Sequence, residues 1–269
     1  MGGRGARGAA AAQGRVRTLC WALFTALGIH GGAAAQAPAP VAAPPAEDPG
    51  AVVDRLVAAM VSAERATKTW TFVLERQELV DGEMMPAERM QVSFQKPFAV
   101  YAKWIGAVDN GQELIFKKGW NGDQLMVNPP GLVPTLNLDP RGAVAMRGNR
   151  HPILDLGFPF LVGRIAADHQ LARAHPGSAT VEDLGPRTVS GRAARCYRST
   201  LPKDQYPSLY AYKAEICVDT ALNLPTEVKV WDKVGGSVQL VERYTFSAVK
   251  VNPSLDPLTF DPENPAYGF

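Results

Sequence analysis

The chain has 269 residues, 46% of them hydrophobic, and its formal net charge of +2 is the small difference between 28 basic and 26 acidic residues. Four of the basic residues precede residue 18, so a chain without that segment has 24 basic and 26 acidic residues and a net charge of −2. A weakly acidic chain lacks the excess of Lys and Arg that is typical of nucleic-acid-binding proteins, so the composition gives no case for that class of partner.

The first 35 residues have the pattern of a secretory signal peptide. A segment with four arginines and no acidic residue precedes the apolar run 19–29, and small residues follow it. We expect cleavage after Ala35 and a periplasmic mature protein. The run is too short to span a bilayer, so no transmembrane segment is expected after cleavage. A lipid-anchored form would need a cysteine at the end of the run, but Cys20 lies at its start.

A linker and a helix are expected next. Residues 36–47 are rich in Ala and Pro, which favours an extended tether without a core. Asp48 suits the N-cap of a helix and Pro49 suits its first turn, and apolar residues then recur at helical spacing as far as Ala66. We therefore expect residues 48–269 to form a single domain that begins with an amphipathic helix.

From Thr69 the apolar residues recur with a period of two, which is typical of half-buried strands. The alternation continues after Asp81-Gly82 and in the run KPFAVYAKWIG, and Asn121-Gly122 is a hairpin signal between two more short strands. The apolar faces carry Trp70, Phe72, Leu74, Met90, Val92, Phe94, Phe98, Val100 and Trp104. These residues either fill a closed core or line a cavity for a ligand, because aromatic and Met side chains suit both roles.

A second helix is predicted in the middle of the chain. Several prolines between residues 129 and 140 indicate a long connection, and a helical pattern follows at about 153–173. Phe158, Leu161 and Val162 lie on its apolar face, and we expect them to complete the wall of a cavity.

A polar cluster of Arg147, Asn149, Arg150 and His151 precedes this helix. Its arginines could bind the anionic head group of a ligand, because guanidinium groups present a fork of donors to phosphate or carboxylate. The alternative is a solvated loop whose arginines pair with nearby carboxylates. Asp155 follows His151 by four residues, so a catalytic pair is a third interpretation, against an N-cap carboxylate near a surface histidine.

Strands resume near Ala179 and contain the two cysteines that remain after cleavage. Cys196 and Cys217 are centred on the turn-like stretch LPKDQYPS, so a hairpin there places them opposite each other and also places Arg198 opposite Glu215. In an oxidising compartment we expect a disulfide, worth about 3 kcal/mol. Two free thiols in separate strands are the alternative.

The last strands are predicted in LPTEVKVWD and SVQLVERYTFSAVKVN, which gives the order helix, five strands, helix, five strands and tail. This order predicts the α+β class. A sheet of about ten strands tends to curl, so we expect a strongly curved antiparallel sheet, a half-open barrel with helices covering the concave side.

The sequence contains no catalytic or cofactor motif that fits its context. The one G-x-G-x-x-G match lies in the signal peptide, and the mature chain has only His151, His169 and His175, which leaves little from which to build a metal site. We therefore expect no enzyme activity, no cofactor and no metal.

A family resemblance rests on phrases that occur in one order along the chain. The leading helix is followed by KPFAVYAKWIG, GQELIFKKGWNGDQLMVNP, NLPTEVKVWD and YTFSAVKVNPSLDPLTF, and together these resemble the periplasmic lipoprotein-carrier (LolA/LolB-like) superfamily. The block LDPRGAVAMRGNRHPI is similar to domain of unknown function 1571. The superfamily resemblance implies a half-open barrel with a helical lid over an apolar cavity for acyl chains, with Phe98, Val100 and Trp104 on the concave side and no catalytic residue.

Two functions therefore stand beside each other. The first is an exported envelope protein that binds or transfers a lipid or a lipidated protein in an apolar cavity. The second is an interaction, sensor or scaffold module of the cell envelope, with a protein partner and the same fold without a ligand. A void of several hundred cubic ångströms beneath the helices would favour the first function.

Overall fold

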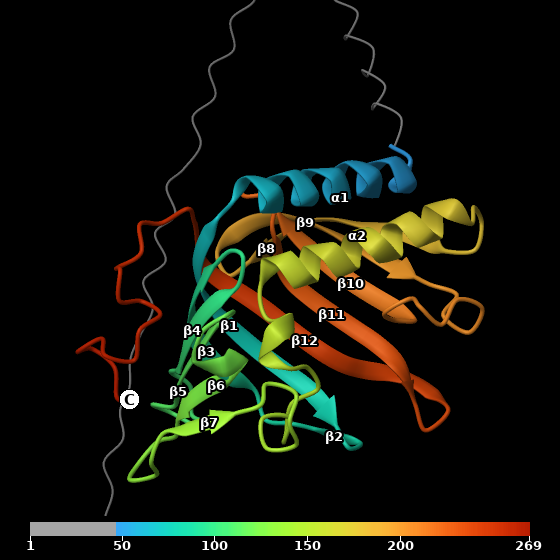
Figure 1. Ribbon diagram of the computed structural model, residues 1–269. Coiled ribbons are helices and arrows are strands. Elements are labelled where there is room, and N and C mark those ends of the chain that lie inside the picture. Colours follow the sequence, from blue (N-terminus) through green and yellow to red (C-terminus); the bar gives the residue numbers. More distant parts are fainter. Residues whose placement is uncertain (1–46) are drawn as a thin grey trace, which may run out of the picture. The chain divides into compact units, whose positions relative to one another are not determined.

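The computed structural model of the protein describes residues 47–269, so the predicted signal peptide and all but the last residue of the predicted linker lie outside the described residues. Figure 1 shows a single sheet that curves beneath two helices. The bounds of its elements in chain order are α1 Pro49–Ala66, β1 Thr69–Val80, β2 Glu83–Met84, β3 Glu88–Gln95, β4 Ala99–Trp104, β5 Glu113–Lys117, β6 Leu125–Asn128, β7 Leu136–Leu138, α2 Phe158–Ala174, β8 Thr180–Val189, β9 Arg192–Thr200, β10 Lys213–Asp219, β11 Pro225–Val234 and β12 Ser237–Val251.

Helix α1 begins and ends where the sequence predicts. The Asp48 carboxylate accepts a hydrogen bond from the Ala51 backbone N–H at 2.9 Å, and Pro49 occupies the first turn, where its missing N–H costs nothing. Its apolar face is buried against α2 and the strands of the second half of the sheet.

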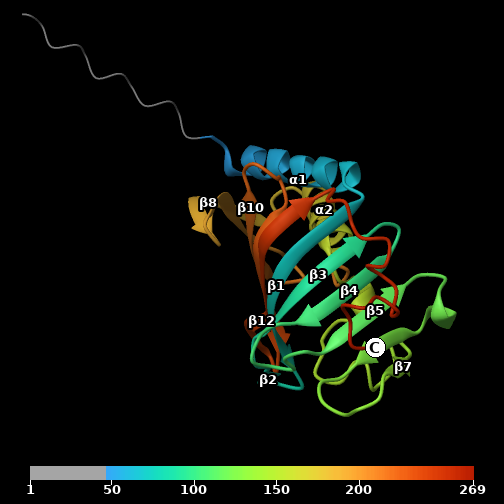
Figure 2. The ribbon, with the colours of Figure 1, turned by 90° about the vertical axis from the view of Figure 1, so that its left-hand side faces the viewer.

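All strands of the sheet pair antiparallel, in the order β7-β6-β5-β4-β3-β1-β12-β11-β10-β9-β8, and β2 pairs with β1 beside this path. The first and last strands of the chain, β1 and β12, are therefore neighbours in the middle of the sheet. Figure 2, turned by 90°, shows the strong twist and the helices lying across one end of the strands. The predicted α+β class and curved antiparallel sheet are confirmed.

The sheet has 12 strands where the sequence predicts about ten. The two additional strands are β2 and β7, which are two and three residues long and too short to show a period of two. Helix α2 also begins later than expected, at Phe158, because residues 153–155 form a separate 3₁₀ turn. Gly157 then adopts a φ of 103°, and a Cβ atom there would lie 3.1 Å from the Phe94 ring.

The core on the concave side consists of two adjoining apolar clusters. One lies over the first half of the sheet and is rich in aromatic rings, with Phe158 of α2 at its centre. The other joins α1 and Val162 of α2 to strands β9–β12. Space remains on the concave side between the sheet and the elements that cover it.

Candidate functional site

A cavity of about 560 Å³ lies on the concave side of the sheet. Its roof is helix α2 together with residues 139–157, a segment that crosses the concave face and is here called the strap. The floor consists of side chains from both halves of the sheet, from Leu74 in β1 to Val230 in β11. Helix α1 contributes no side chain to the wall, so α2 and the strap, and not two helices, cover the space.

Both ends of the cavity are apolar. At the β3–β7 end the wall includes Met90, Trp104, Leu114, Leu125 and Val127. At the β9–β11 end it includes Leu201, Ala214, Ile216, Val228 and Val230. The volume falls within the range of about 300 to 1,000 Å³ that is usual for ligand pockets.

The residues expected to face a cavity divide between its wall and the neighbouring core. Leu74, Met90, Trp104 and Leu161 line the cavity. The others pack in the core clusters: Trp70, Phe72, Val92, Phe94, Phe98, Val100, Phe158 and Val162. The aromatic rings fill this part of the concave side through edge-to-face contacts, such as Phe72 with Phe158 at 5.3 Å.

A polar centre separates the two apolar ends. Glu78 of β1 and Glu242 of β12 lie directly opposite each other in the sheet, and only 5% and 1% of their surfaces are exposed. Like charges placed in this way destabilise a sheet unless donors and cations surround them. Tyr244 Oη donates to Glu78 Oε1 at 2.6 Å, and Tyr210 Oη donates to Glu242 Oε2 at 2.8 Å.

The strap supplies the positive charge. Arg150 Nε donates to Glu242 Oε1 at 2.7 Å, and the Arg150 backbone N–H donates to Glu78 Oε2 at 2.8 Å. His151 Nε2 lies 3.0 Å from Glu242 Oε1. Every oxygen of the two carboxylates therefore accepts at least one hydrogen bond, so the polar centre fastens the strap to the sheet.

His151 is the titratable group at the junction. Its Nε2 also lies 2.7 Å from Tyr210 Oη, and its Nδ1 lies 3.6 Å from Asp155 Oδ2. Burial disfavours the imidazolium, but the hydrogen bond and charge of Glu242, together with the charges of Glu78 and Asp155, outweigh burial and raise the pKa of His151. Burial and the charge of Glu242 also raise the pKa of Tyr210, which keeps this hydroxyl protonated as a donor.

The four head-group candidates have different surroundings. Arg150 and His151 pair with Glu242, and Asn149 accepts from Arg76, which in turn pairs with Glu88. Arg147 is the one exposed residue of the four. It lines the cavity and has no carboxylate partner among residues 47–269. Carboxylates of the sheet thus pair with two of the four residues, Arg150 and His151, in contacts that are half-buried and not solvated.

The sequence interpretation missed Glu78 and Glu242, and with them Tyr210 and Tyr244. A signal was present, because both glutamates lie on the period of two of the apolar faces: Glu78 follows Leu74 by four residues in β1, and Glu242 precedes Tyr244 and Phe246 by two and four residues in β12. An acidic residue on an apolar face needs a partner, and that requirement points to a buried polar site.

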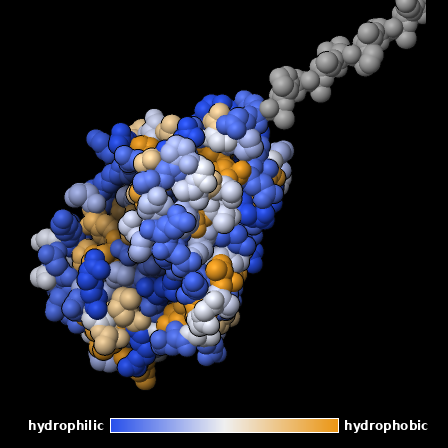
Figure 3. All heavy atoms as spheres, turned by 90° about the vertical axis from the view of Figure 1, so that its right-hand side faces the viewer, coloured by the Kyte–Doolittle hydropathy of each residue, from blue (hydrophilic) through white to orange (hydrophobic). Residues whose placement is uncertain are grey.

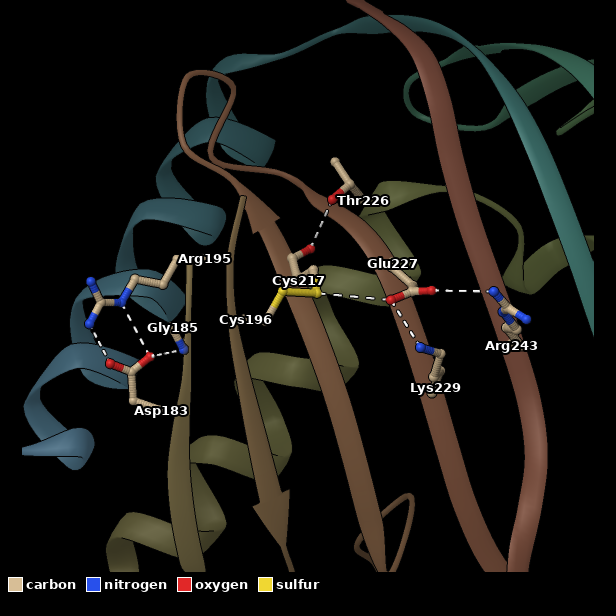
Figure 4. Close-up of a disulfide and its surroundings, with 9 residues drawn as sticks. All are labelled: Asp183, Gly185, Arg195, Cys196, Cys217, Thr226, Glu227, Lys229 and Arg243. Atoms are coloured by element: carbon tan, nitrogen blue, oxygen red, sulfur yellow. Dashed lines mark hydrogen bonds and ion pairs between the residues drawn. A yellow bond between two sulfur atoms is a disulfide. The ribbon is translucent and has the colours of Figure 1, made fainter. Parts of the chain in front are cut away.

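The predicted disulfide is present, and its register is confirmed. Cys196 of β9 is bonded to Cys217 of β10, and Arg198 pairs with Glu215 at 2.6 Å. Side chains alternate along a strand, so the cysteines lie on the face opposite to that of Tyr197 and Ile216, which line the cavity. Figure 4 shows the disulfide beside the ion pairs of the outer face, where Glu227 meets Lys229 and Arg243.

Two further properties concern residues 47–269. Neither α1 nor α2 has the length and apolar character that a membrane-spanning helix needs. This part of the chain also holds no group of three or more His, Cys, Asp or Glu side chains placed to bind a metal ion.

Comparison with known proteins gives one sequence family. A family described as "Protein of unknown function (DUF1571)" matches residues 67–269. No curated protein matches the chain in sequence.

Comparison with solved structures gives similarities of fold at low identity. Lipoprotein LppX from Mycobacterium tuberculosis is 13% identical, with a TM-score of 0.44 over 76% of this chain and 98% of that chain. LprF from Mycobacterium bovis is 13% identical, with a TM-score of 0.40 over 77% of this chain and 98% of that chain. A LolA superfamily protein from Nitrosomonas europaea is 11% identical, with a TM-score of 0.31 over 77% and 96%.

Proposed function

The chain belongs to the DUF1571 family of proteins of unknown function, as its sequence resemblance predicts, and from this premise we propose that it binds the acyl chain of a lipid or of a lipidated protein in its concave cavity. The protein acts as a carrier or receptor in the bacterial cell envelope and catalyses no reaction. It reaches the periplasm through the signal peptide predicted at residues 1–35.

One observation carries the proposal: about 560 Å³ of space remains between the sheet and its covering elements. A protein interior is normally packed without voids larger than a water molecule, so a cavity of this size needs a reason. Its two ends are apolar, and an acyl chain offers apolar surface in a shape that can follow the curve of the sheet.

The polar centre supports a binding role in place of a catalytic one. Among the histidines of residues 47–269, only His151 contacts Glu242, and its neighbours hold it against the sheet. Its Nε2 lies 3.0 Å from Glu242 Oε1, so the imidazole serves to fasten the strap to the sheet.

The test is to identify what the protein carries when it is purified from the periplasm. Native mass spectrometry and lipid extraction should find an amphiphile bound to the wild-type protein. Ala214→Trp should lower its occupancy at least severalfold, because Ala214 lines the cavity from β10 and the larger ring would take its space.

The matched control is Ala193→Trp, in the neighbouring strand β9, where Ala193 is exposed and does not line the cavity. This variant should keep the wild-type occupancy. A wild-type protein that is consistently empty, and that takes up no fatty acid or phospholipid when these are supplied, would rule out the proposed function.

A further inference from the structure

The loop between β6 and β7 presents apolar side chains to solvent. Residues 124–138 include no charged residue, and the loop itself contains Pro129, Pro130 and Pro134. At its tip Leu132 is fully exposed, and 49% of the surface of Val133 is exposed. In Figure 3 the face drawn is a mosaic of hydrophilic residues with scattered hydrophobic spots, so apolar exposure gathered in one short loop needs an explanation.

This apolar surface continues into the cavity. Leu136, the first residue after the loop, and Val144 in the strap are both exposed at one side and line the cavity at the other. Figures 1 and 2 both place the β6–β7 loop and the strap at the same, lower end of the molecule. The exposed apolar surface and the wall of the cavity therefore share the side chains of Leu136 and Val144.

Positive charge lies beside the apolar tip. Between residues 124 and 154 the chain has three arginines and one carboxylate, Asp139, whose Oδ1 accepts from the Arg141 backbone N–H at 2.9 Å. Arg150 is held by Glu242, whereas Arg141 and Arg147 are exposed and form no ion pair with any residue of the described chain. Such a surface complements anionic lipid head groups.

We propose that the tip residues Leu132 and Val133, flanked by Arg141 and Arg147, dock the protein on an anionic lipid surface, where the cavity is loaded or emptied. Four exposed aliphatic side chains cannot bury the roughly 1,200 Å² that a stable protein interface needs. A few apolar side chains combined with arginines do suffice for reversible binding at a bilayer surface. The loading step rests on the proposed cavity function, but the docking step does not.

The experiment is co-sedimentation of the mature protein with vesicles of phosphatidylcholine containing phosphatidylglycerol, compared with phosphatidylcholine alone. The wild-type protein should bind the anionic vesicles, and rising salt should weaken this binding. The double variant Leu132→Asp/Val133→Asp should reduce partitioning at least tenfold. Arg141→Glu/Arg147→Glu should abolish the preference for the anionic vesicles.

Matched controls separate the loop from general surface properties. Val238 in β12 is exposed to the same 49% as Val133, so Val238→Asp should leave vesicle binding unchanged. The charge control is Arg187→Glu, at an exposed arginine of β8 without an ion pair in the described chain. Circular dichroism should show that all variants are folded.

Several outcomes would overturn the proposal. These are no binding to either vesicle type, equal loss with Val238→Asp, or self-association of the wild-type protein that the tip variant abolishes. Because the assay uses vesicles and no cavity ligand, docking with a permanently empty cavity would reject the carrier function alone. A filled cavity without docking would reject this inference alone.

Discussion

His151 is held between carboxylates on two elements, and this position makes its contribution to stability depend on pH. Its folded pKa is raised by Glu242, Glu78 and Asp155 against the effect of burial, whereas in the unfolded chain it returns to the ordinary value of about 6.5. A raised folded pKa means that the folded state holds the proton more tightly. The resulting stability is therefore fully present below about pH 6.5 and is lost as pH rises through the folded pKa.

We predict that His151→Gln lowers the free energy of unfolding by about 2 kcal/mol below pH 6.5, the scale of hydrogen bonds to charged groups. The loss should shrink at a pH above the folded pKa, where the wild-type imidazole is also neutral. Urea unfolding at several pH values measures both quantities. His175→Gln is the control, because His175 stacks on Tyr206 outside the polar centre; a loss at His151 that does not change with pH would contradict the assignment.

At the scale of residues, the sequence predicts which face a side chain occupies but not whether it meets space or another side chain. Trp70 and Leu74 lie on the same face of β1, yet Trp70 packs in the aromatic core and Leu74 lines the cavity. The difference depends on where Phe158 of α2 packs along the sheet. The pairing of Glu78 with Glu242 is likewise non-local, because it depends on β1 and β12 being neighbours.

At the scale of elements, local signals were sufficient where both partners lie close in sequence. The capped start of α1 and the register of the β9–β10 hairpin are confirmed, because the Asp48 cap and the cysteine positions define them locally. The start of α2 was predicted wrongly, since Ile153, Leu154 and Leu156 fit the apolar pattern of a helix, but residues 153–155 form a 3₁₀ turn before Gly157. Such choices depend on contacts with Phe94 that no local pattern contains.

The β9–β10 hairpin provides an element-scale prediction. Replacing both cysteines, Cys196→Ala/Cys217→Ala, should lower the free energy of unfolding by about 3 kcal/mol, because the unfolded chain gains the freedom of the loop that the bond closes. Lipid occupancy should not change, since the bond lies on the face opposite to the cavity. Urea unfolding with and without a reductant measures the first effect, and native mass spectrometry measures the second.

If this variant remains folded but loses its bound lipid, the disulfide on the opposite face of the sheet is needed to maintain the shape of the cavity. An unfolding midpoint of the wild-type protein that is unaffected by a reductant would contradict the stabilising role of the bond.

At the scale of the whole molecule, one strand pair joins the two halves of the sheet. Strands β3–β7 extend from β1, strands β8–β11 extend from β12, and β1 and β12 pair along most of their length. The cavity floor crosses this seam, with Leu74 on one side and Phe246 on the other. Closing the seam requires strands from opposite ends of the chain to meet, which is costly in loop entropy.

A crosslink across the seam should therefore stabilise the protein more than its native disulfide does. Glu75 and Thr245 face each other directly in the β1–β12 register and alternate with residues of the concave face. A bond in Glu75→Cys/Thr245→Cys would close a far longer loop than the native one, and we predict a gain of about 5 kcal/mol in the free energy of unfolding. Thiol titration shows whether the bond forms, and urea unfolding measures the gain against each single-cysteine variant. The entropic account of the seam fails if the bond forms quantitatively and the unfolding midpoint stays unchanged. In that case β1 and β12 would already lie close together in the unfolded chain.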